Sequence, residues 1–87
     1  MKMLAFAVLD EKTEAFLPPF FVVAPGQAIR LFTDGCADRE SPLGKHPGDY
    51  KLYRIGSFDD AAGGLSGEQP VLMCSGAEVT TQQLRAV

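Results

Sequence analysis

Blocks of apolar residues separated by polar segments predict two strands near the start of the chain. Met3–Leu9 is a continuous apolar run that ends at charged residues, and its length suits a strand better than a helix. Phe20–Val23 is the second strand candidate. Pro18 and Pro19 precede it and cannot donate to a sheet ladder, so they must lie at its entry or on an edge. The polar segment Asp10–Ala15 therefore predicts a hairpin connection between the two runs.

The pattern changes to a helical one after the second run. A proline at position 25 is favoured in the first turn of a helix, where its missing N–H costs nothing. The apolar residues Ile29, Phe32 and Cys36 then recur at helical spacing, with polar residues between them. These signals predict one helix over Pro25–Ala37.

Strand patterns return in the second half of the chain. The segment Asp38–Gly48 is rich in proline, glycine and charge and has no periodicity, so we expect an exposed, mobile loop that folding does not need. Tyr50–Phe58 contains three aromatic residues and Ile55, which suit a half-buried strand, so it predicts a third strand, closed by the turn-forming pair Asp59-Asp60. The segment Ala61–Gln69 reads as a glycine-rich turn, and Pro70–Ser75 as a fourth strand.

The predicted order is strand, strand, helix, strand, strand, which indicates an α+β domain with one helix packed on a small, mainly antiparallel sheet. We expect a single domain over residues 1–87, with an ordered core over about 3–75. The polar tail 76–87 is expected to be either disordered or a short helix. One helix covers only one sheet face, so the other face needs water-tolerant residues or a second subunit. We therefore expect a homo-oligomer, most simply a dimer, whose interface uses Leu17, Phe20, Phe21, Val22 and Val23.

Composition and charge narrow the classes of partner. The chain is 46% hydrophobic and 22% charged, as is typical of a globular protein. Its formal net charge of -3 counts against a general nucleic-acid packaging protein, because non-specific affinity for phosphate comes from cations, although a local basic patch remains open. Met3–Leu9 is too short to cross a membrane, and no cleavage pattern follows it. We expect a soluble, intracellular protein with no membrane partner.

The residues that could carry chemistry form no catalytic set. Cys36 and Cys74 lie far apart in the sequence with no CxxC pattern, which excludes a typical zinc site and favours two free thiols, with a disulfide left open. His46 is the single histidine and has neither a nucleophile nor an orienting carboxylate assigned to it. The pair Asp59-Asp60 suits a turn, and Gly63–Gly67 lacks the context of a phosphate loop. We expect a protein that is not an enzyme and holds no cofactor.

A nucleic-acid surface is the remaining candidate from the residues. Cations and aromatic residues that share a sheet face can hold phosphates and stack bases. Strict alternation, however, places Lys51 and Tyr53 on one face, and Arg54 with Tyr50 and Phe58 on the other. The alternative is a set of solvated cations beside core aromatics. If single-stranded DNA binds, the cations expected to contribute are Arg30, Lys45, Lys51 and Arg54.

Three segments resemble a known family. They are Phe6–Asp10, Pro19–Phe32 and Gly48–Asp59, and the last contains the distinctive block DYKLYRIGSFD. In these segments the chain resembles the small nonstructural protein of gokushoviruses, which are single-stranded DNA phages of the microvirus group; the resemblance covers about residues 4–75. It implies a nonstructural phage protein of the host cytoplasm that binds DNA and helps to switch viral synthesis to single-stranded genomes.

Two functions therefore stay open at this point. The first is DNA binding or assistance to single-stranded DNA synthesis. The second is a protein-interaction adaptor that contacts phage replication or capsid proteins without touching DNA. The resemblance carries no catalytic motif to this chain.

Overall fold

The computed structural model describes the backbone of residues 1–85 and the side chains of residues 1–80. Within this part of the chain, five strands and three α-helices form, with one 3-10 turn. No helix among the described residues has the length and apolar content needed to span a membrane. The elements in chain order are β1 (Lys2–Asp10), β2 (Ala15–Phe16), β3 (Phe20–Val22), α1 (Pro25–Ala37), α2 (Pro42–Lys45), η1 (Pro47–Asp49), β4 (Tyr50–Asp59), β5 (Gly64–Ser75) and α3 (Gly76–Arg85).

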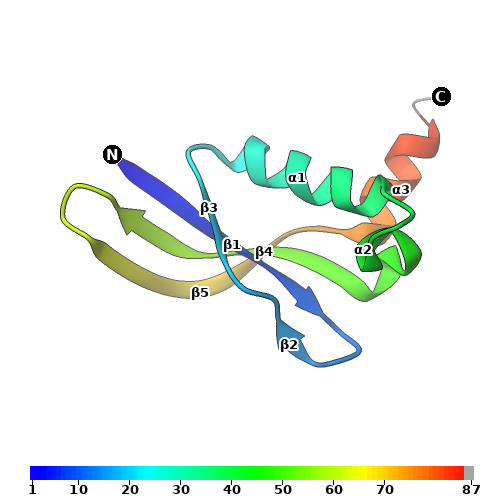
Figure 1. The fold of residues 1–87 in the computed structure, drawn as a ribbon, viewed down its shortest axis with the longest axis horizontal. Coiled ribbons are helices and arrows are strands. Elements are labelled where there is room, and N and C mark those ends of the chain that lie inside the picture. The colour runs from blue at the N-terminus through cyan, green and yellow to red at the C-terminus, as the bar shows by residue number, and fades with distance from the viewer. Residues whose placement is uncertain (86–87) are drawn as a thin grey trace.

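The strands form one antiparallel sheet in the order β2-β1-β4-β5 (Figure 1). The short strands β2 and β3 both pair with β1, β2 near its end at Leu9 and β3 near its start at Leu4. Strand β2 was not expected, because it is only two residues long and directly follows a polar segment that was predicted to be a connection. The α+β fold with one main helix on an antiparallel sheet is confirmed.

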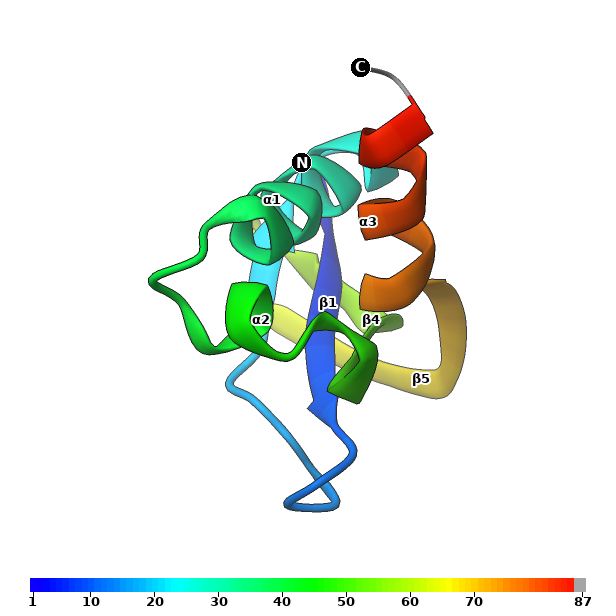
Figure 2. The ribbon, with the colours of Figure 1, turned by 90° about the vertical axis from the view of Figure 1, so that its right-hand side faces the viewer.

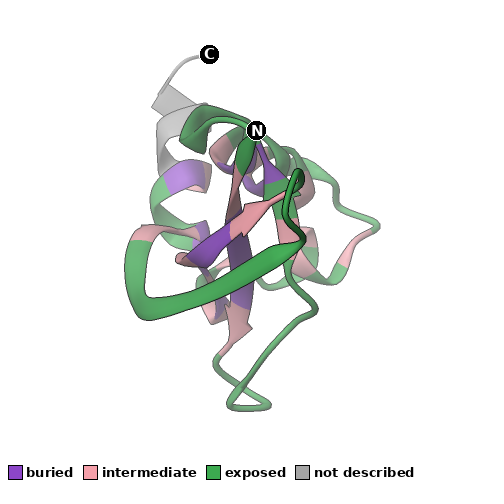
Figure 3. Ribbon diagram, turned by 90° about the vertical axis from the view of Figure 1, so that its left-hand side faces the viewer, coloured by how far each residue is buried: buried purple, intermediate pink, exposed green. Residues whose placement is uncertain are grey.

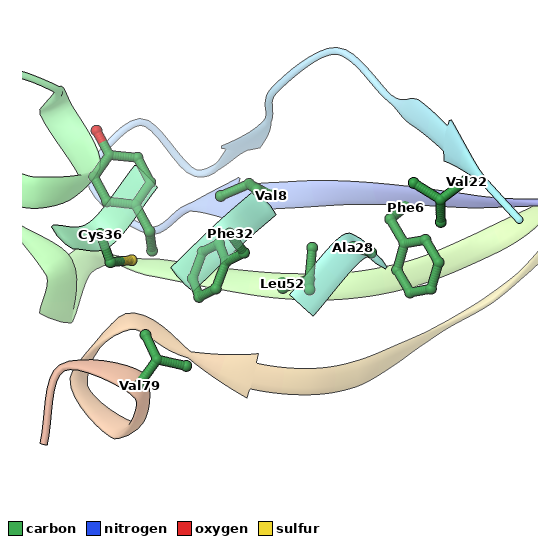
Figure 4. Close-up of a cluster of buried hydrophobic side chains, with 9 residues drawn as sticks. Phe6, Val8, Val22, Ala28, Phe32, Cys36, Leu52 and Val79 are labelled. Atoms are coloured by element: carbon green, nitrogen blue, oxygen red, sulfur yellow. The ribbon is translucent and has the colours of Figure 1, made fainter. Parts of the chain in front are cut away.

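The helices lie on one side of the sheet (Figures 1 and 2). We call that side the covered face and the opposite side the outer face. The core lies between the helices and the covered face, where Phe6 and Leu52 are fully buried against α1 (Figure 4). Helix α1 contributes the apolar stripe that its spacing predicted, and the buried cluster comprises Phe6, Val8, Val22, Ala28, Phe32, Cys36, Tyr50, Leu52 and Val79.

A β-bulge on β4 changes which residues share a face. The register of β4 against β1 moves from Arg54 to Gly56, so Ile55 is the extra residue. Strict alternation predicted that Phe58 lies on the same face as Arg54. That prediction was wrong, because the bulge reverses the alternation and brings Phe58 to the outer face with Tyr53.

Strand β5 begins much earlier than the sequence indicated. The segment Ala61–Gln69 was expected to be a turn, but pairing with β4 extends the strand back to Gly64. The turn itself is short: the amide of Ala61 donates to the Asp59 carboxylate over 3.0 Å, which confirms the turn role of that aspartate. Glycines have weak strand propensity, so the cross-strand ladder decides the structure here.

The expectation of an irregular loop over Asp38–Gly48 was also wrong. This segment contains α2, whose first turn is capped by Ser41: its hydroxyl accepts from the amide of Gly44 over 3.0 Å and donates to the carbonyl of Gly35 over 2.7 Å. Leu43 packs against the core. An apolar anchor of this kind makes the segment part of the folded unit.

The core also extends beyond Ser75, the limit expected from the sequence. The Ser75 hydroxyl accepts from the amide of Glu78, which makes Ser75 the N-cap of α3, and it donates to the Glu78 carboxylate. Val79 on this helix is only 4% exposed and belongs to the core. The spacing of Ser75 and Glu78 was a readable signal for this helix. The last two residues of the expected tail lie outside the described residues.

Candidate interaction surface

No helix covers the outer face (Figures 1 and 2), and large apolar side chains that stay exposed gather there. Register places them there: Phe16 pairs with Leu9, Phe21 with Ala5, Leu72 with Tyr53, and Leu65 with Phe58. Partners opposite each other on neighbouring strands point to the same side of a sheet. The outer-face cluster is therefore Phe16, Phe21, Tyr53, Phe58, Leu65 and Leu72.

Two aromatic pairs form within this cluster. Phe16 and Tyr53 meet edge to face with ring centroids 5.5 Å apart, and Phe21 and Phe58 meet at a tilt with centroids 5.6 Å apart. Such pairs contribute roughly 0.5–1.5 kcal/mol beyond the area that they bury. They hold the rings in place, yet Phe16 is still 45% exposed and Phe21 is 39% exposed.

A hollow of about 260 Å³ opens beside the second aromatic pair. Small residues of three neighbouring strands line it, Ala5 on β1, Gly56 on β4 and Gly67 on β5. The rest of the wall is formed by the apolar residues Pro19, Phe21, Ile55 and Leu65, together with Ser66. Gly56 has a second reason to lack a side chain, because a Cβ there would lie 2.1 Å from the carbonyl oxygen of Ser66.

The outer face carries little net charge. Lys51 lies on it, opposite Leu9, and its ammonium is 2.8 Å from the Glu11 carboxylate. The side-chain hydrogen bond to Glu11, and the negative charge of that carboxylate, raise the pKa of Lys51. The cation is therefore matched by a carboxylate beside the apolar cluster.

The four cations proposed for DNA are not brought together. Lys51 lies on the outer face, whereas Arg54 lies on the covered face beside Glu68, with its guanidinium 3.8 Å from the carboxylate. The Nε atom of Arg54 is buried without a hydrogen-bond partner. Arg30 is exposed on α1 and Lys45 is exposed on α2, both in the helix layer. These four side chains do not form one basic patch.

The predicted oligomer segment divides between the two sides. Phe20 packs on the core cluster and Val22 is buried within it, so both serve the chain's own fold. Leu17 and Phe21 are each 39% exposed and Val23 is 50% exposed. Period-two alternation over this short strand separates core residues from exposed ones, a distinction that the apolar run alone did not reveal.

The remaining candidate residues are the two cysteines and His46. Both cysteines are free; burial, with Cys74 as a smaller contribution, raises the pKa of the Cys36 thiol to about 11. His46 is exposed where α2 ends. Among the described residues, no group of three or more histidine, cysteine or acidic side chains is placed to hold a metal ion.

Comparison with protein families assigns the chain. The model of the Phage ORF5 protein family matches residues 3–79. The chain belongs to this family. It is therefore a phage protein, and the match spans the sheet, α1 and the start of α3. No curated protein and no solved structure matches the chain.

Proposed function

We propose that this phage protein is a non-enzymatic adaptor that assists viral single-stranded DNA synthesis in the host cytoplasm. It contacts a replication or capsid protein of its phage through the outer face. The assignment to gokushoviruses of the microvirus group, on which the DNA-synthesis role depends, rests on the resemblance of the block Gly48–Asp59.

The observation that carries the adaptor role is the apolar character of the outer face. The outer face holds two aromatic pairs together with Leu65 and Leu72, and no helix covers them. A contiguous apolar patch of this kind, unlike single scattered apolar residues, marks a protein interface. Aromatic residues are enriched in interface centres, and charged residues are depleted there. The outer face holds two aromatic pairs, and the Lys51 ammonium beside them is paired with Glu11.

The test uses purified replication and capsid proteins of the same phage. Leu72 on the outer face is 50% exposed, and Leu31 on α1 is 56% exposed, which makes them a matched pair. We expect Leu72→Ser to weaken binding about tenfold or more, as loss of a central interface contact does, and Leu31→Ser to leave it unchanged. Equal effects of the two substitutions, or no binding to either class of protein by the wild type, would exclude this role for the outer face.

Direct binding of single-stranded DNA is the second candidate. The observation in its favour is that aromatic rings and Lys51 share the outer face, and base stacking on such rings contributes roughly 1–3 kcal/mol per base. Binding would be weak and largely independent of sequence, because few cations face the same way.

A salt titration against single-stranded DNA, with a neutral polymer as control, tests this candidate. Because the two cations lie on opposite faces, Lys51→Ala should shallow the salt slope by about 0.7 and Arg54→Ala should leave it unchanged. If the wild type does not bind even at low salt, the adaptor role alone remains.

A further inference from the structure

A protruding side chain and a hollow lie next to each other on the outer face. Leu65 is 70% exposed, and it also forms one wall of the hollow of about 260 Å³. An apolar cavity of roughly 150 Å³ already holds a benzene ring, so this hollow has room for a large apolar side chain. The chain therefore presents both a knob and a hole within one patch.

We propose that the outer face binds the outer face of a second copy, with Leu65 of each chain inserted into the hollow of the other. This proposal rests on the proposed role of the outer face as an interaction surface, and it names a partner for that surface. A two-fold interface uses the same patch on both chains, so a knob must lie beside a hole of matching character. Leu65 and the hollow meet this condition. Two sheets packed face to face in this way interdigitate their side chains, as in a β-sandwich.

The charge distribution permits this approach. Each chain carries a formal net charge of -3, which weakly opposes the association of two copies. On the outer face the Lys51 ammonium is paired with Glu11, and the aromatic cluster and hollow are apolar. Apolar contact on this face therefore brings no unpaired like charges together.

The exposed area is sufficient for a weak dimer. A large side chain such as Phe presents roughly 150–250 Å² when fully exposed. From the exposed fractions of Phe16, Phe21, Leu65 and Leu72, these side chains leave on the order of 400 Å² of apolar surface per chain. If the half-exposed neighbouring residues are included, the surface area that two copies bury approaches the lower limit for specific interfaces, about 1,200 Å² in total. We expect a dissociation constant in the micromolar range.

Pairing through the free edge of β5 is disfavoured by comparison. This edge strand is exposed over residues 64–72 (Figure 3). Its register against β4 is interrupted between Gly67 and Val71, and the interruption contains Glu68 and Pro70. A bulge, a charge and a proline are the devices by which sheet edges avoid adding another strand. The face of the sheet, and not this edge, is therefore the surface that we assign to a second copy.

Sedimentation of the purified full chain over a concentration series tests the proposal. We expect a monomer–dimer equilibrium that Leu65→Ser shifts about tenfold or more toward monomer, because two knobs are lost per dimer. Gly67→Val should have the same effect by filling the hole, since a Cβ at Gly67 meets no atom within 4 Å and the fold can accept it. Leu31→Ser, at an exposed position in the helix layer, should leave the equilibrium unchanged. Circular dichroism checks that each variant is folded.

The outcomes separate this proposal from the proposed function. A monomeric wild type up to about 1 mM, or a dimer that neither Leu65→Ser nor Gly67→Val weakens, would overturn the self-association. If the wild type is monomeric but Leu72→Ser still loses a phage partner, the adaptor role stands and the dimer does not. If the dimer behaves as expected and neither phage protein binds, the dimer stands and the adaptor role fails.

Discussion

On the covered face Phe6 and Leu52 are fully buried, whereas on the outer face Phe21 and Leu65 remain 39% and 70% exposed. The residue types are the same, and the difference lies in what packs over them. Burial of the first pair beneath α1 stabilises the folded state. The second pair keeps most of its apolar surface in contact with water, so its stabilising effect is still available for binding. Similar side chains on one sheet thus stabilise the fold on one face and stay available for binding on the other.

The largest expected effect tests this contrast directly. Phe6→Ala should lower the free energy of unfolding by about 3–5 kcal/mol, because it leaves a cavity beneath α1. Phe21→Ala should cost about 1 kcal/mol in the monomer, mainly through the lost pairing with Phe58. Urea denaturation measures both, at several protein concentrations because self-association adds apparent stability. Similar costs at the two positions would contradict the division between the faces.

The next effect concerns the hollow of the outer face. Gly56→Ala should cost about 2–3 kcal/mol, because the added Cβ lies 2.1 Å from the carbonyl oxygen of Ser66 and the backbone must shift. Gly67→Ala, on the neighbouring strand, meets no atom within 4 Å and should change stability little. Thermal unfolding compares the two variants. A tolerated alanine at both positions would show that β4 and β5 do not approach as closely as described.

The next largest effect concerns whether α3 belongs to the core. Val79→Ala should destabilise the protein by about 1–2 kcal/mol, since this side chain is 4% exposed in the core. Glu40→Ala, at an exposed position, serves as control. If chemical denaturation gives the same midpoint for both variants, α3 is not part of the core.

The smallest effect is a dependence on alkaline pH. The pKa of Cys36 rises from 9.0 to about 11 in the folded protein, chiefly through burial. The unfolded chain therefore loses its thiol proton first, and stability should fall as pH rises from about 9 to 11. Cys36→Ala should show a shallower decline over this range in urea titrations at stepped pH, because Cys74, Tyr50 and Lys51, whose pKa values are also raised in the folded protein, are present in both proteins. Parallel curves would contradict a buried, neutral Cys36.

Much of the covered face was predictable from local signals. Helix α1 runs over Pro25–Ala37 as expected, because a first-turn proline and the spacing of Phe32 and Cys36 are features of neighbouring residues. The exposed apolar residues Leu17 and Phe21 were also indicated by their run. The rest of the candidate surface was not. Leu65 lies in a segment of glycines whose strand exists through its pairing with β4.

The sequence by itself determined the element types with strong local periodicity, the mild negative charge and the presence of more apolar residues than one helix can cover. Only the tertiary structure decided which of them face outward. The bulge at Ile55 moves Phe58 to the outer face, and the β4–β5 ladder brings Leu65 beside the hollow. The physical reason is that a strand's facing depends on register with its neighbours, and a single extra residue reverses it.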